Sequence, residues 1–350
     1  MSAKTTQIGV VATGAGDDIA ANVAVVQVPA PTGTPAPGYV RVAVDAAAVN
    51  PVDWKMVQYN FLLSKLPAQV LGNDASGKVT AVGEGVTNVK VGDEVYAYTP
   101  IADANGAFQE AVDTPWYTVF PKPEALSHAD AATVPLAIFT AAVALFKQLP
   151  SLGADLALAP GSGAGRPLLI WGGASSVGHV AIQLANYAGF RVITLASAKH
   201  TERLTALGAA AVIDYHDADY ADQVAAALNG EPLTLAFDTI SPDTTLKAAA
   251  LLDSSQPSYI TSINQGIEDA TFPDNVTHIF TIVVEFNPES ELGQWAAGAY
   301  DTIASALQAI PIQAQNVLEL GSSWADLANG IAQLAGGVSG VKLVATHLSA

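Results

Sequence analysis

The second half of the chain alternates short apolar runs with amphipathic segments, and this alternation limits the folds that it can adopt. The apolar runs begin with LLIW at 168–171 and continue with RVITLA, AAVIDY and LTLAFDTI. Segments such as SVGHVAIQLANYAG lie between these runs and repeat their apolar residues at the spacing of one helix face. Strands that alternate with helices predict a parallel sheet covered on both faces, which is a doubly wound α/β fold.

The first part of the chain has a different pattern. Its apolar runs are shorter and are broken by glycines, as in YVRVAVDAAAVN and GDEVYAY. Alternating valine and alanine with glycine breaks indicates strands and turns, so we predict a β-rich domain here. The last segment, GVSGVKLVATHL, has the pattern of a turn and a strand that returns to this domain. The predicted boundaries are therefore 1–135 with 310–350 for the β-rich domain, and 136–309 for the nucleotide-binding domain.

Charge and composition exclude several classes of partner and chemistry. The net charge is −18, from 32 acidic residues against 14 Lys and Arg. An acidic surface repels nucleic acid and anionic lipid, so neither is expected as a main partner. The chain has no cysteine, which excludes disulfides, thiolate nucleophiles and Cys-ligated zinc.

Neither the N-terminal segment nor the most apolar stretch indicates a membrane. The N-terminal sequence lacks a basic start followed by an apolar core, so no signal peptide is expected and we predict a cytoplasmic protein. The most apolar stretch, AATVPLAIFTAAVALF at 131–146, is short for a membrane span and contains Pro135. We predict that it forms a buried helix.

The stretch GGASSVG at 172–178 lies between a predicted strand and a predicted helix. Gly173 and Gly178 take the first and third places of the GxGxxG fingerprint, and Ser175 takes the second. In this setting free N–H groups and the helix dipole meet a pyrophosphate. An ordinary tight turn between strand and helix is the alternative interpretation.

The residues after the next predicted strand indicate which nicotinamide cofactor is used. NAD enzymes place an acidic residue there to bind the ribose 2′-hydroxyl, but no Asp or Glu appears before Glu202. Ser197 and Lys199 are instead donors suited to a 2′-phosphate, and Tyr215 can add a hydroxyl. We therefore predict NADP(H). The alternatives are a solvated lysine at a helix start and a surface tyrosine.

Several stretches together resemble the medium-chain dehydrogenase/reductase family. They are VLGNDASGKVTAVGEGVTNVKVGDEVYAY at 70–98, VNPVDWK at 49–55, IWGGASSVG at 170–178 and GVSGVKLV at 337–344. The resemblance covers nearly the whole chain. It implies a GroES-like β-rich catalytic domain plus a doubly wound Rossmann NADP-binding domain.

Within that family the chain resembles the zinc-independent branch. Zinc alcohol dehydrogenases have a Cys and a His at the places of Asn50 and Asn73, and their four-cysteine structural lobe is missing here. The resemblance therefore implies no metal. NPVDWK, IWGGASSVG and FNPESELGQW are most similar to quinone-oxidoreductase-type proteins, in particular the fungal trans-acting enoyl reductases. Those enzymes use NADPH to reduce an activated carbon–carbon double bond.

The resemblance also implies roles for individual residues. Residues expected beside the nicotinamide and its ribose are Asn50, Pro51, Val52, Asp53, Ser262, Ile263, Val338 and Ser339. Residues expected around the pyrophosphate and the 2′-phosphate are Gly173, Ser175, Ser176, Val177, Gly178, Ser197, Lys199, His200 and Tyr215. The segments 141–148 and 283–287 are expected to face the substrate.

Lys55, Thr140 and Asp53 are the candidate catalytic residues. Lys55 can donate to an enolate or supply a proton, and Thr140 can orient the ring or the substrate. The alternatives are a surface lysine at 55, a structural cap at Asp53, and a helix-wall threonine bonded to its own helix at 140.

Three functions remain open from the sequence. The first is an NADPH-dependent, zinc-free reductase of an enone or enoyl thioester. The second is an NADPH:quinone oxidoreductase, which shares the hydride step. The third is a non-catalytic NADPH-binding relative. A homodimer and a monomer are both compatible with the pattern. A polyketide synthase partner is conceivable, although the charge of −18 disfavours docking to an acidic carrier domain.

Overall fold

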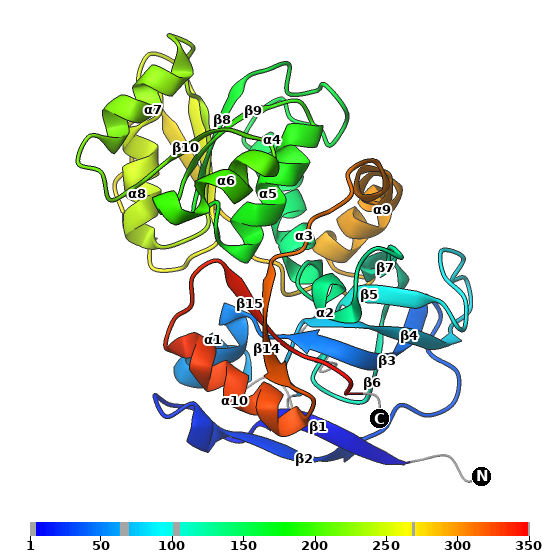
Figure 1. The fold of residues 1–350 in the computed structure, drawn as a ribbon. Helices are drawn as coiled ribbons and strands as arrows, with labels where there is room; N and C mark the ends of the chain where they lie inside the picture. The colour runs from blue at the N-terminus through cyan, green and yellow to red at the C-terminus, as the bar shows by residue number, and fades with distance from the viewer. Residues whose placement is uncertain (1–4, 64–69, 101–105, 268–269, 349–350) are drawn as a thin grey trace. The chain divides into compact units, whose positions relative to one another are not determined.

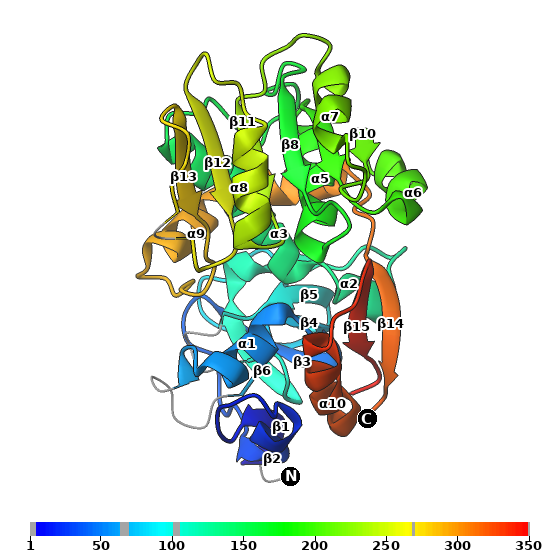
Figure 2. The same cartoon turned by 90° about the vertical axis from the view of Figure 1, so that its left-hand side faces the viewer.

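The computed structural model describes residues 5–63, 70–100, 106–267 and 270–348 (Figures 1 and 2). Internal contacts divide the chain into two compact units. The first unit comprises 1–136, 284–300 and 314–350, and the second comprises 137–283 and 301–313.

The first unit is built on a seven-stranded, mainly antiparallel sheet with the order β14-β15-β3-β4-β5-β7 and with β6 paired to β3. A two-stranded sheet, β1-β2, precedes it in the sequence. The strands are β1 (Thr6–Ala12), β2 (Val23–Pro29), β3 (Tyr39–Ala48), β4 (Asp74–Val82), β5 (Glu94–Tyr98), β6 (Ala111–Pro115), β7 (Val119–Pro121), β14 (Asn316–Gly321) and β15 (Val341–Ala345). The helices are η1 (Ala20–Asn22), α1 (Pro51–Tyr59), η4 (Trp116–Thr118), α2 (His128–Ala131) and α10 (Trp324–Ala335).

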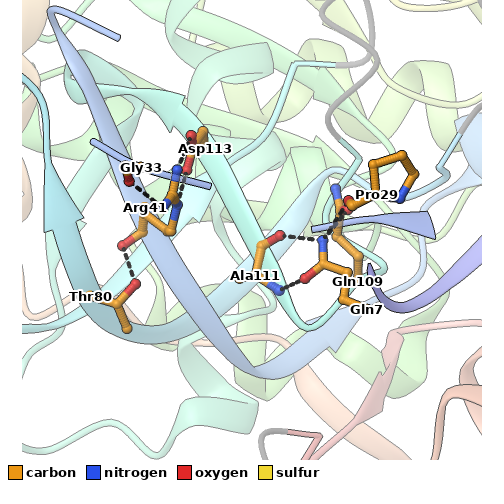
Figure 3. Close-up of polar contacts among 8 residues, drawn as sticks. All are labelled: Gln7, Pro29, Gly33, Arg41, Thr80, Gln109, Ala111 and Asp113. Atoms are coloured by element: carbon orange, nitrogen blue, oxygen red, sulfur yellow. Dashed lines mark hydrogen bonds and ion pairs between the residues drawn. The ribbon is translucent and has the colours of Figure 1, made fainter. Parts of the chain in front are cut away.

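Two polar clusters join the early strands of this unit (Figure 3). The Gln7 amide nitrogen donates to Gln109 Oε1 at 2.7 Å and to the Ala111 carbonyl at 2.9 Å, which ties β1 to β6. Arg41 on β3 donates to both carboxylate oxygens of Asp113 on β6, at 2.7 and 2.9 Å. A two-point contact of this kind fixes the orientation of both side chains.

The second unit is a six-stranded parallel sheet with the order β10-β9-β8-β11-β12-β13. Its strands are β8 (Pro167–Trp171), β9 (Arg191–Leu195), β10 (Ala209–Ile213), β11 (Leu235–Asp238), β12 (Ser258–Ser262) and β13 (Val276–Phe280). Its helices are η5 (Ala144–Gln148), α4 (Leu149–Ser151), α5 (Ser176–Tyr187), η6 (Ala198–His200), α6 (Thr201–Ala206), α7 (Tyr220–Leu228) and α8 (Pro242–Ala250). Helices α3 (Pro135–Val143) and α9 (Glu291–Ala309) contribute residues to both units.

Both faces of the parallel sheet are covered by helices. Leu169 and Trp171 belong to one apolar cluster with residues of α7 and α8. Leu168 and Ile170 point to the opposite face because side chains alternate along a strand. These four residues are buried, and α5 contacts β8 and β9. From β8 the strands continue in one direction to β9 and β10, and from β11 they continue in the opposite direction to β12 and β13. Ligands bind at this reversal of strand order in sheets of this type. The predicted doubly wound fold is confirmed.

The apolar stretch around Pro135 forms the long helical run 128–151. By length and composition this run could cross a membrane, but 78% of its most apolar 18-residue window is buried inside the protein. The core helix of a globular protein passes the same test, so this run gives only weak evidence for a membrane span.

The segment 284–300 packs with the first unit, whereas the sequence pattern assigned it to the continuous 136–309 segment. Phe286 is fully buried, and its ring lies edge-on to Tyr98 with centroids 5.3 Å apart. Tyr300 stacks on Phe120 at 5.1 Å with nearly parallel rings. Aromatic contacts between distant segments have no local sequence pattern, so periodicity alone gave no sign of them.

Candidate functional site

The phosphate-loop candidate follows β8, and close packing at two of its glycines leaves no room for a side chain. Gly172 has φ +89°, and a Cβ there would lie 2.4 Å from carbons of Ile240. A Cβ on Gly178 would lie 2.2 Å from the Gly172 carbonyl oxygen, which is backbone and cannot give way. Gly172 is thus the residue that makes the left-handed turn, one place before the fingerprint glycine Gly173.

Ser175 caps the helix that follows this loop. Its Oγ accepts from the Gly178 N–H at 2.9 Å and lies 2.8 Å from Thr239 Oγ1. Thr239 Oγ1 donates to the Trp171 carbonyl at 2.9 Å, so the Ser175 hydroxyl hydrogen is directed at Thr239. The N–H groups of Ser176 and Val177 have no intrahelical acceptor, as in any first helical turn. With the helix dipole, those two groups suit a pyrophosphate.

The residues predicted to bind a 2′-phosphate lie on two neighbouring loops of the second unit. Ser197, Lys199 and His200 follow β9, and Tyr215 follows β10, the strand paired with β9. The Ser197 hydroxyl donates to Tyr215 Oη at 3.3 Å. The Lys199 side chain is exposed. Partial burial lowers the pKa of His200, and neighbouring Lys199 and Arg203 lower it further.

Asp214 is a residue of these loops that the sequence analysis missed. Its Oδ2 accepts from the Ala198 N–H at 2.8 Å, and its Oδ1 accepts from the His216 N–H at 2.9 Å. Hydrogen bonds from these two backbone groups hold the pKa of Asp214 down to about 2. The fingerprint places its ribose-binding acid after the second strand of the sheet, whereas Asp214 follows the third, β10.

The remaining predicted residues of the second unit lie in its interior or at strand ends. Ser262 is fully buried at the end of β12, and its Oγ lies 2.9 Å from His278 Nε2, with Ile263 next in the chain. Asp238 aligns with Ser262 across β11 and β12. Burial raises the pKa of Asp238 to about 6, although the Thr245 and Thr244 hydroxyls donate to it. Thr140 is buried in α3.

In the first unit, the loop at Asn50 leads into α1. Asn50 is extended and Pro51 begins the helix, which suits a residue without an N–H. The Asp53 carboxylate accepts from the Asn50 N–H at 2.7 Å, so it stabilises the helix start. Asp53 is fully buried, and its other oxygen has no hydrogen-bond partner among the described residues. Burial raises the pKa of Asp53 to about 7.

Val52 and Lys55 lie on the same helix start and are half-buried. The Lys55 ammonium lies 5.7 Å from the centre of the Trp54 ring. Partial burial lowers the pKa of Lys55. Val338 and Ser339 lie in the exposed turn before β15.

A buried ion pair that contacts the Asn50 side chain was also missed by the sequence analysis. Lys342 on β15 lies 2.9 Å from Asp74 Oδ2 on β4, and the two side chains are 3% and 0% exposed. Asn50 donates from Nδ2 to Asp74 at 2.8 Å and accepts a hydrogen bond from Lys342 through Oδ1. The other Asp74 oxygen accepts from the Leu136 N–H at 2.6 Å. This network joins four distant parts of the sequence.

The raised pKa of Asp53 predicts a measurable pH dependence of stability. Folding keeps the proton on Asp53 up to about pH 7, whereas its ordinary pKa is 3.8. The free energy of unfolding therefore falls as pH rises between these values, by at most about 1.4 kcal/mol per pH unit from this group. Asp53→Asn lacks this contribution. Denaturant unfolding measures the free energy of unfolding of both proteins at about pH 5 and at about pH 6.5. Between these two pH values, the stability of the wild type relative to the variant should fall by about 2 kcal/mol. Parallel stability curves would show that Asp53 is ionised throughout.

Two family models match the chain. The model described as "Alcohol dehydrogenase GroES-like domain" matches residues 36–124, and the model described as "Zinc-binding dehydrogenase" matches residues 176–256. Trans-enoyl reductase TOXD of Cochliobolus carbonum is 35% identical over 59% of this chain and 68% of its own length. The chain belongs to the medium-chain dehydrogenase/reductase family. The predicted family and the GroES-like and Rossmann domains are thereby confirmed.

Other members of the family extend this comparison. Dehydrogenase azaJ of Aspergillus niger is 40% identical over 63% of this chain. The match spans 66% of azaJ, so about a third of that relative lies outside it. The quinone oxidoreductase from Coxiella burnetii has the same fold, with a TM-score of 0.68, 25% identity and coverage of 97% and 99% of the two chains. Over the described parts of this chain, no group of three or more His, Cys, Asp or Glu is placed to hold a metal ion.

Proposed function

We propose that this member of the family is an NADPH-dependent, zinc-free reductase of activated carbon–carbon double bonds, such as those of enones and enoyl thioesters. The observation that carries the proposal is the pair of loops after β9 and β10. Ser197 and Tyr215 are hydrogen-bonded there, and the exposed Lys199 follows Ser197 by two positions in the chain. They belong to the same doubly wound sheet as the glycine loop at 172–178. The fungal relatives named trans-enoyl reductases support the choice of acceptor.

The residues present fit a nicotinamide dinucleotide with a 2′-phosphate. The lack of a side chain at Gly172 and Gly178 allows the loop to pack against the start of α5, with two helix N–H groups available for the pyrophosphate. Lys199, Ser197 and Tyr215 supply a cation and two hydroxyls for the 2′-phosphate. A mycobacterial protein of the same fold, Rv1454c, has been solved in complex with NADPH.

The chemistry asks for a hydride, a proton and stabilisation of developing negative charge. NADPH, when bound, supplies the hydride to the electron-poor β-carbon. We assign Lys55 as the proton source for the α-carbon, because its lowered pKa eases proton release. The same ammonium can stabilise the enolate oxygen before the proton moves. The Thr140 hydroxyl orients the reacting groups. Asp53 supports the Asn50 loop through the Asn50 N–H.

The chemistry of the Asn50 surroundings supports the proposal of a zinc-free site. Asn50 and Asn73 are weak metal ligands compared with Cys and His. Asn50 Oδ1 accepts from the Lys342 ammonium, and Asn73 donates to the Thr99 carbonyl at 2.9 Å. Asn50 would therefore have to give up its hydrogen bond from Lys342 before its oxygen could bind a metal ion.

Quinone reduction is the second candidate, and the fold shared with the Coxiella burnetii quinone oxidoreductase favours it. A non-catalytic NADPH-binding protein is the third. Three further predictions from the sequence stay predictions. They are a cytoplasmic location, a monomer or homodimer, and a polyketide synthase partner.

An acceptor panel tests the proposed function. NADPH oxidation is followed by absorbance at about 340 nm with an enone, an enoyl thioester and a quinone, and each is repeated with NADH. We expect turnover of the first two acceptors with NADPH and a clear preference for NADPH over NADH. Turnover of the quinone alone would favour the second candidate. Tight NADPH binding without any turnover would favour the third.

A further inference from the structure

The two loops proposed to bind the 2′-phosphate are joined through one carboxylate, that of Asp214. It accepts from the Ala198 N–H of the loop after β9 at 2.8 Å. It also accepts from the His216 N–H, in the loop after β10, at 2.9 Å. The Asp214 side chain is 18% exposed, so most of its surface is withdrawn from water.

Asp214 also fixes the Tyr215 ring through His216. His216 Nδ1 lies 2.7 Å from Asp214 Oδ1, and an ionised carboxylate at that distance requires the hydrogen to be on Nδ1. The His216 ring lies against the Tyr215 ring, with centroids 4.1 Å apart. The Tyr215 hydroxyl in turn accepts from Ser197 at 3.3 Å. These contacts connect Asp214 to Tyr215 through the His216 ring, and Tyr215 to Ser197. Ser197 precedes Ala198, whose N–H donates to Asp214, so the contacts form a ring.

We propose that Asp214 is a positioning residue that holds Ser197, Lys199 and Tyr215 in the arrangement that selects a 2′-phosphorylated ribose. This inference rests on the proposed use of NADP(H). A bare carboxylate near a phosphate would repel it, but both Asp214 oxygens accept hydrogen bonds from groups of the two loops. Removal of the Asp214 charge therefore distinguishes the two effects. A positioning role predicts weaker binding of the 2′-phosphate, whereas simple repulsion by the carboxylate predicts tighter binding.

Calorimetric titration with two adenosine probes separates these effects. The first probe, 2′,5′-ADP, carries the 2′-phosphate, and the second, 5′-AMP, lacks it. Asp214→Asn replaces one carboxylate oxygen with an NH2 group, which cannot accept a hydrogen bond. The variant therefore loses the hydrogen bond from either Ala198 or His216. We expect binding of 2′,5′-ADP to weaken about 10-fold, which corresponds to about 1.4 kcal/mol, and binding of 5′-AMP to change less than about 2-fold.

Asp214→Glu is the second variant. It keeps the charge but moves the carboxylate by one methylene, so positioning predicts weaker 2′,5′-ADP binding here too. Asp217→Asn is the matched control, because Asp217 is an exposed acid of the same loop and its side chain accepts from Gln223. The control should bind both probes as the wild type does, or slightly more tightly.

Each outcome decides the question. Unchanged or tighter binding of 2′,5′-ADP by Asp214→Asn would overturn the positioning role. An equal loss for both probes would also overturn it, because that is the result of a collapsed loop. If the wild type binds the two probes equally, the proposed NADP(H) preference fails as well. If the wild type prefers 2′,5′-ADP and both Asp214 variants retain that preference, only the role of Asp214 fails.

Discussion

Replacing Lys342 with methionine is expected to lower the free energy of unfolding by about 3–5 kcal/mol. Methionine fills nearly the same space but leaves the Asp74 carboxylate, which is 0% exposed, without its cationic partner. The Asn50 side chain loses a donor in the same step. Urea or guanidinium unfolding of wild type and variant, monitored by circular dichroism, measures the difference.

Two comparisons make this prediction sharp. Lys90→Met breaks an exposed ion pair, in which Lys90 is 84% exposed, and should cost less than about 1 kcal/mol. The double variant Lys342→Met, Asp74→Asn removes both charges and should be more stable than Lys342→Met alone. A loss of less than about 1 kcal/mol for Lys342→Met would show that the stability of the fold does not depend on the Lys342–Asp74 pair, and would contradict this prediction.

Replacing Lys199 with glutamate is expected to weaken NADPH binding about 100-fold, which is about 2.7 kcal/mol. The change substitutes a repulsive carboxylate for a cation at the proposed 2′-phosphate position. NADH lacks that phosphate, and a glutamate there can accept from its ribose 2′-hydroxyl. NADH affinity should therefore stay within a few-fold of the wild type or improve. Fluorescence titration of both nucleotides measures the two dissociation constants.

Lys90→Glu is the control for overall charge. It makes the same change of net charge in the first unit, on a lysine that is 84% exposed. NADPH affinity should hardly change in this variant, because Lys90 is not one of the residues proposed to bind the 2′-phosphate and its side chain is solvated. If Lys199→Glu binds NADPH as tightly as the wild type, the 2′-phosphate assignment is wrong.

The fold could be predicted from the sequence because its signals are local. The alternating runs after Pro167 carry strand and helix periodicity, and the glycine loop marks the first turn between them. The resemblance of VLGNDASGKVTAVGEGVTNVKVGDEVYAY to the family indicated the GroES-like domain, and the family model over 36–124 confirms it. The roles of individual site residues stay predictions until the experiments above are done.

The contacts that the sequence did not predict are long-range. Lys342 and Asp74 are 268 positions apart, and only the fold brings β15 and β4 to the two sides of β3. Asp214 follows β10, one strand later than the position at which the dinucleotide fingerprint places an acid, so the fingerprint gives no sign of it. Gly172, which makes the turn with φ +89°, stands beside the fingerprint glycine that was chosen in its place. A doublet of glycines does not reveal which of the two adopts the positive φ that the turn needs.

Transfer of deuterium tests the central claim most directly. NADPH labelled with deuterium at nicotinamide C4, in each of its two stereochemical forms, is incubated with the protein and an enone, and the product is analysed by NMR and mass spectrometry. The proposal predicts that one labelled form delivers its deuterium to the β-carbon of a saturated ketone. Deuterium at the carbonyl carbon, or oxidation of NADPH with no deuterium on product carbon, would contradict it.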